Sequence, residues 1–100
     1  MNREERDKLY DRAVKKWGEE GQLFQMIEEM AELTVAINKY RRMITDMAQN
    51  SKGVMEHLYE ELADVKLCLE QMEFMFGKEN VDKALEIKLQ KFLGQLNNNK

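Results

Sequence analysis

Residues 22–49, QLFQMIEEMAELTVAINKYRRMITDMAQ, form the stretch that decides the fold of this 100-residue chain. Apolar side chains recur in it mostly at steps of three and four residues, and it contains neither glycine nor proline. This spacing is the period of an amphipathic α-helix, so we expect one long helix here. The predicted apolar stripe comprises Leu23, Met26, Ile27, Met30, Leu33, Ile37, Tyr40, Ile44 and Met47.

Glycines mark the ends of this helix and of its neighbours. Gly18 and Gly21 precede it, Gly53 follows it in NSKG, and Gly77 lies in FGKEN. Because glycine is a poor helix former and the chain has no proline, we expect the helices to break at these positions. The sequence therefore predicts an all-α fold with four helices, at about 2–16, 22–49, 54–76 and 81–96, and a frayed tail within 93–100.

Composition limits the size and the surroundings of this fold. A chain of 100 residues has room for a single domain, 1–100, and 35% charged residues leave it a small core, so we expect a homo-oligomer, most simply a homodimer. A net charge of −3 argues against a nucleic-acid polymer or an anionic membrane as partner. One cysteine, Cys68, and an N-terminus without an apolar stretch indicate a cytoplasmic protein.

Two pairs of acidic residues carry the chemical information. Glu29 and Glu32 lie three residues apart in the second helix, and Glu61 and Asp64 have the same spacing in the third. Residues three apart share a helix face, so each helix presents one acidic pair. If the two helices pack antiparallel across NSKG, the four carboxylates converge and require a cation.

The alternative is that these acids are ordinary solvated charges, as most helical glutamates are. Two observations count against it. None of the four acids has a Lys or Arg three or four residues away, and Glu61 projects only about 40° from Val65, inside the apolar stripe of its helix. A glutamate on a buried face without a partner is costly, so we expect a ligand there. Glu32 lies off its stripe, which requires a second contact face on that helix.

Ligands that are all oxygen select hard cations. Mg²⁺, for which Mn²⁺ is a possible substitute, is usually held by a few carboxylates together with waters and substrate phosphates, so a phosphate substrate is expected. A di-iron carboxylate bundle would need two Glu-x-x-His motifs, and His57 is the only histidine. A zinc site is excluded in the same way by one Cys and one His.

The segments KWGEEGQLFQMIEEMAELTVAINKYRR, EELADVKLCLEQM and VDKALEIKLQKF resemble the MazG-like all-α nucleoside triphosphate pyrophosphohydrolases over about residues 13–93. The defining Glu-x-x-Glu and Glu-x-x-Asp pattern falls on Glu29, Glu32, Glu61 and Asp64. The resemblance implies a four-helix, bundle-type fold assembling as a dimer or tetramer. It also implies that these four acids are the metal ligands and catalytic residues, holding Mg²⁺ for hydrolysis of an NTP or dNTP to monophosphate and pyrophosphate.

Three further residues are candidates for substrate binding. Lys88 and Lys91 of the fourth helix are either phosphate-binding residues or ordinary surface charges, and Gly94 and Gln95 stand where a further basic residue often follows. Trp17 is a candidate for stacking on the base, whereas a lone tryptophan at a helix junction more often serves packing.

Two other functions are compatible with a helical chain of this kind. The first is a catalytically inert oligomerisation or regulatory module with the same fold, against which the presence of all four acids counts. The second is a cation buffer or sensor, which usually places its ligands in an Asp-rich loop that this chain lacks.

Overall fold

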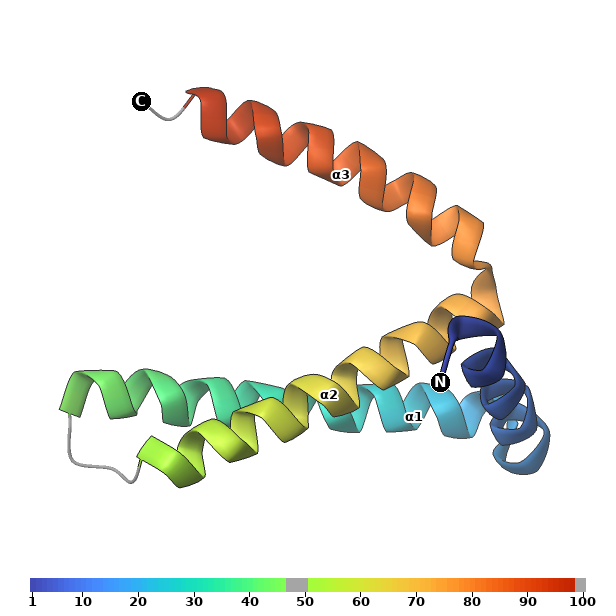
Figure 1. Cartoon of the computed structure of the whole chain (residues 1–100), viewed down its shortest axis with the longest axis horizontal. Coiled ribbons are helices and arrows are strands. Elements are labelled where there is room, and N and C mark those ends of the chain that lie inside the picture. The colour runs from blue at the N-terminus through green and yellow to red at the C-terminus, as the bar shows by residue number, and fades with distance from the viewer. Residues whose placement is uncertain (47–50, 99–100) are drawn as a thin grey trace.

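The structure, a computed structural model, describes residues 1–46 and 51–98. These residues form three α-helices and no strand, which confirms the all-α class: α1 (Arg3–Asp46), α2 (Ser51–Phe76) and α3 (Lys78–Asn98). The long part of α1 and α2 run antiparallel beside one another, and α3 departs from the end of α2 (Figure 1).

A sharp bend at Gly18 divides α1. Gly18 has φ 83° and ψ 159°, a backbone conformation open almost exclusively to glycine. The bend separates an N-terminal arm, residues 3–17, from the long segment, residues 19–46, and Figure 1 shows the dark-blue arm turned away from the direction of the cyan and green segment. The predicted break between the first two helices is therefore confirmed at Gly18, whereas Gly21, which was also expected to break the chain, is helical.

The other helix ends also differ from expectation. Gly53 lies inside α2 and not in a turn, and glycine within a helix costs only about 1 kcal/mol relative to alanine. The predicted helix end at residues 47–49 lies outside the described residues. α3 continues to Asn98, so residues 93–98, expected to fray, are helical.

The face of α1 that meets α2 overlaps only one edge of the predicted apolar stripe, where Leu33 and Tyr40 are half-buried. Ala36 is 1% exposed and, with Val65 and Cys68 of α2, forms much of the small described core. Gln22, Glu29 and Ala36 recur every seven residues on this face, whereas the stripe residues Met30 and Ile37 lie about a quarter of a turn away, Ile27 lies nearly half a turn away, and all three are about half exposed. The predicted metal site needed α1 to be contacted on a second face, because Glu32 lies off the apolar stripe. That second face is the one that packs on α2.

Charged side chains fasten the arm to α2. Arg6 Nε donates to Glu70 Oε1 at 2.7 Å, and the Tyr10 hydroxyl donates to the same oxygen at 2.7 Å. Arg3 donates to Glu73 Oε1 at 2.9 Å and to the Glu70 carbonyl at 3.2 Å. These contacts hold the arm against the C-terminal half of α2, beside the bend.

The third helix buries none of its residues. In Figure 1 it diverges from the α1–α2 pair, so the described residues of one chain pack as two helices with α3 outside them. Of the described helices, none has both the length and the apolar character needed to cross a membrane.

Candidate metal centre and adjoining cleft

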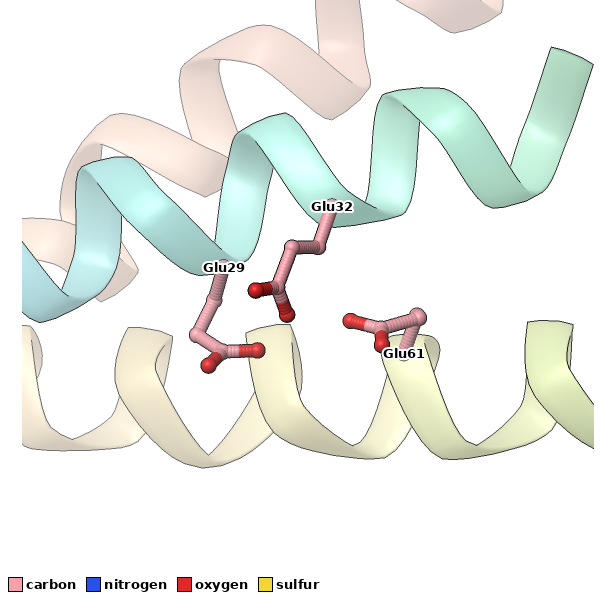
Figure 2. A group of neighbouring side chains, drawn as sticks. All are labelled: Glu29, Glu32 and Glu61. Atoms are coloured by element: carbon pink, nitrogen blue, oxygen red, sulfur yellow. The ribbon is translucent and has the colours of Figure 1, made fainter.

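Three of the four predicted ligand residues come together between α1 and α2. Each of Glu29, Glu32 and Glu61 has a carboxylate oxygen within 4.8 Å of one of the others'. Figure 2 shows Glu29 and Glu32 projecting from α1 and Glu61 from α2, with their carboxylates turned toward the space between the helices. We call these three residues the acidic cluster.

The cluster contains carboxylate oxygens that the protein does not satisfy. Glu61 is 8% exposed, as its place in the apolar stripe predicts, while Glu29 is half-buried. Among the buried side-chain polar atoms of the described residues, only Glu29 Oε2 and Glu61 Oε2 lack a hydrogen-bond partner. The other Glu29 oxygen accepts from Gln25 Nε2 at 2.9 Å. Buried polar atoms are almost always bonded, so these two oxygens are suited to an external ligand.

Burial and like charge both act on these carboxylates. The pKa of Glu29 is raised by desolvation first and then by the negative charges of Glu32, Asp64 and Glu61. The pKa of Glu61 is raised by desolvation and then by Glu32 and Asp64, with His57 opposing this effect. Both shifts mean that the ionised cluster is unfavourable in the free protein, and that a cation would relieve it.

Asp64, the fourth predicted ligand, is near the cluster but outside it. Its side chain is exposed, and it is not among the three residues whose oxygens lie within 4.8 Å. Its charge nevertheless contributes to the raised pKa of Glu29, Glu61 and the buried Cys68 thiol. It therefore stands at the edge of the site, within electrostatic reach of two cluster members.

The chemistry of the acidic cluster fits a hard divalent cation. All three side chains offer oxygen, the donor type that Mg²⁺, Ca²⁺ and Mn²⁺ prefer. One buried oxygen each of Glu29 and Glu61 has no hydrogen-bond partner. A carboxylate from each of two facing helices is an arrangement in which a cation would replace repulsion by attraction.

A cleft of about 790 Å³ adjoins the acidic cluster. The arm forms one wall, and the long segment of α1 and α2 form the others. Glu29 and Asp64 line its acidic end, so a molecule in the cleft can reach a cation held by the cluster. Its remaining lining residues are Leu9, Tyr10, Arg12, Ala13, Lys15, Lys16, Trp17, Gln22, Gln25, Leu67, Cys68 and Gln71.

The predicted substrate-binding residues divide between the cleft and α3. Trp17 lines the cleft, with the Lys16 ammonium 5.3 Å from its ring centroid. Lys88 and Lys91 are exposed on α3 and do not line it.

Sequence reasoning missed the arm residue Arg12 and the glutamines Gln22 and Gln71. A signal for the glutamines existed, because Gln22 precedes Glu29 by seven residues and Gln71 follows Asp64 by seven, which places each on the helix face of an acid.

Comparisons of this chain with family models, with curated proteins and with solved structures find no match.

Proposed function

We propose that this chain is a Mg²⁺-dependent nucleoside triphosphate pyrophosphohydrolase of the MazG-like type. The observation that carries the proposal is Glu61, a glutamate that is 8% exposed, has an unpaired carboxylate oxygen and faces two further carboxylates. Burial of such a group as an anion is costly unless a cation or hydrogen bonds offset it. The adjoining cleft supplies room for an organic substrate next to that cation.

Each residue then has a defined task. Glu29, Glu32 and Glu61 hold the metal, and Asp64 at the rim adds negative charge or a further ligand. When bound, Mg²⁺ neutralises the phosphates and activates water for attack. Arg12, which lines the cleft and has no ion-pair partner among the described residues, balances charge on the departing pyrophosphate. Lys88 and Lys91 lie outside the cleft, so the phosphate-binding role expected of them requires a second copy of the chain.

The working form is proposed to be an oligomer, a dimer or a tetramer, in which the helices form a bundle. The reason is the amount of apolar surface that one chain leaves uncovered. Among the described residues, exposed apolar side chains occur on all three helices, including Ile27 and Met30 of α1, Leu69 of α2, and Leu85 and Phe92 of α3. Surfaces of this kind mark sites of association. The alternative, an inert assembly module, accounts for the same apolar surface but does not account for the buried carboxylates.

One experiment tests the proposed activity. Purified protein is incubated with a panel of NTPs and dNTPs with Mg²⁺, and the products are separated by ion-exchange chromatography. We expect monophosphate and pyrophosphate in equal amounts, no reaction in EDTA, and recovery when Mg²⁺ or Mn²⁺ is restored.

The controls separate this activity from others. Release of orthophosphate alone indicates a phosphatase and contradicts the proposal. Absence of turnover by the folded oligomer with every nucleotide favours the inert module. The Glu61→Gln variant, purified in the same way, controls for contaminating hydrolases, because its product formation should fall to background.

A further inference from the structure

Two glutamines in the cleft have no hydrogen-bond partner among the described residues. Gln22 on α1 is 6% exposed and Gln71 on α2 is 4% exposed, and both line the cleft. Within residues 1–46 and 51–98, neither side-chain amide makes a hydrogen bond. The nitrogen and oxygen of each amide nevertheless keep some accessible surface, because neither glutamine is among the residues with a fully buried, unpaired atom. The amides therefore retain access to the space they line, which is the cleft.

Unpaired amides at this degree of burial point to a ligand. A buried amide that lacks a partner costs free energy, and native proteins seldom keep one without a reason. Two of them, one on each of the packed helices, line the same cleft. Each amide offers two donors and an acceptor with two lone pairs, so together they match a ligand edge that carries both donors and acceptors.

The position of the glutamines relative to the acids gives the length of the ligand. Gln22 lies seven residues before Glu29 on α1, and Gln71 lies seven residues after Asp64 on the antiparallel α2. At a rise of 1.5 Å per residue, each separation along the helix is about 10 Å. The cleft thus has an amide end and a carboxylate end, and a ligand spanning both must carry a polar planar edge at one end and a cation-binding group at the other.

We propose that the cleft binds the nucleoside part of the substrate, with the hydrogen-bonding edge of the base on Gln22 and Gln71 and the phosphates directed toward the acidic cluster. This inference rests on the proposed function for the identity of the ligand. Nucleobases carry donors and acceptors on one planar edge, which is the chemistry that the two amides complement. Tyr10 and Trp17 line the same cleft and supply aromatic surface beside that edge.

Binding of the base is independent of the metal in this arrangement. The glutamines are uncharged and lie about 10 Å along each helix from the acids. The metal-free protein should therefore bind a nucleoside, which carries no phosphate, and should bind it at least ten-fold more tightly than ribose 5-phosphate, which carries no base. A site built around buried hydrogen-bonding groups rejects an analogue that lacks the matching groups.

The test uses the full chain in EDTA and a panel of ribonucleosides and deoxyribonucleosides, with affinities measured by ligand-observed NMR titration. Gln22→Met and Gln71→Met keep the length of the side chain and remove its hydrogen bonds. We expect each variant to lose at least ten-fold in affinity for the preferred nucleoside and to melt at the same temperature as the wild type or higher, since no internal hydrogen bond is lost. Gln90→Met on the exposed surface of α3 is the matched control and should bind like the wild type.

A second measurement needs no variant. The side-chain amide resonances of Gln22 and Gln71 should shift when the nucleoside is added, and that of Gln90 should not. Absence of nucleoside binding, or unchanged affinity in both methionine variants, would overturn the proposal. A lowered melting temperature with unchanged affinity would assign the glutamines to packing.

The result is separable from that of the turnover assay. Nucleoside binding that depends on Gln22 and Gln71, without any hydrolysis, would retain the base site and refute the pyrophosphohydrolase. Hydrolysis that proceeds equally well in both variants would retain the enzyme and refute the base site.

Discussion

Glu61 on α2 and Glu29 on α1 bring carboxylate oxygens within 4.8 Å of each other, and each keeps one buried oxygen without a hydrogen-bond partner. Two glutamates that face one another across a helix interface repel when both are ionised. A cation between the helices, as proposed above, would replace this repulsion by attraction, so we expect the free protein to be less stable than the loaded one.

Replacing Glu61 separates a metal ligand from a structural residue. We expect Glu61→Gln to melt in EDTA at the wild-type temperature or higher, because the repulsion is removed. It should lose most of the stabilisation that Mg²⁺ gives the wild type through linkage. Turnover should fall by at least about 100-fold, since even changes to residues behind metal ligands cost about 10- to 100-fold. Differential scanning fluorimetry with EDTA and with Mg²⁺ measures the shift.

Glu60→Gln is the matched control for this substitution. Glu60 is the exposed neighbour of Glu61 and lies outside the acidic cluster, so its variant should keep the full response to Mg²⁺. An unchanged Mg²⁺ response in Glu61→Gln would show that Glu61 is not a ligand.

The raised pKa values predict the pH dependence of the metal-free protein. A carboxyl whose pKa is higher in the folded than in the unfolded state binds its proton more tightly when folded. Glu29 and Glu61 therefore destabilise the fold above their raised pKa, and this penalty is relieved as the pH falls through it. In EDTA, Glu61→Gln should show a smaller gain in melting temperature on acidification than the wild type. If the melting temperature of Glu61→Gln and that of the wild type changed equally with pH, the proposed coupling of Glu29 and Glu61 would be contradicted.

Glu70 should show the opposite behaviour. Hydrogen bonds from Arg6 and Tyr10 lower its pKa, so its contribution to stability is present at neutral pH and is lost as the pH falls through that lowered pKa. We expect Glu70→Gln to destabilise the fold at pH 7 by about 1 kcal/mol, allowing for the partial exposure of the Arg6 pair. Urea denaturation measures the change. Asp82→Asn, in the exposed Lys78–Asp82 pair, is the control and should have no measurable effect.

The bend in α1 can be tested with a pair of glycines. Gly18 has φ 83° and ψ 159°, and an added Cβ would meet nothing within 4 Å, so the penalty at this position is backbone strain alone. Gly18→Ala should destabilise the fold by about 1–3 kcal/mol. Gly94→Ala, at a helical position that is equally open, should stabilise it by about 0.5–1 kcal/mol. Calorimetry measures the stability of both variants. If Gly18→Ala were as stable as the wild type, the bend could straighten without loss of stability.

The exposed apolar side chains of α3 can be tested as a surface for assembly. Leu85, Leu89 and Phe92 lie on one side of this helix and are about half exposed, while Ile87 lies on the opposite side. If a second copy covers the first side, Leu89→Lys should weaken assembly at least ten-fold and Ile87→Lys should leave it unchanged. Sedimentation velocity at micromolar concentration measures the oligomer. A monomeric, folded and active wild type would contradict the proposed assembly.

Local information in the sequence was sufficient for the helices and for the burial of Glu61. The period of the apolar residues predicts helical segments, and the angle between Glu61 and Val65 places that glutamate on a buried face. Both depend only on neighbours within a few turns, which is why they could be read from one chain. The spacing of Glu29 and Glu32 likewise placed both on one side of α1.

Tertiary structure decided what those helices enclose. The sequence marks Gly18 as a break, but the direction of the bend follows from its φ and ψ, and that direction lays the arm on α2 and creates the cleft. It also decides that α1 meets α2 through the face of Ala36, leaving stripe residues such as Ile27 and Met30 largely uncovered. Gln22 and Gln71, 49 positions apart in the chain, share one cleft because antiparallel packing sets them at the same level. Periodicity fixes positions around a helix axis, whereas the rotation and path of one helix against another depend on contacts between residues distant in the chain.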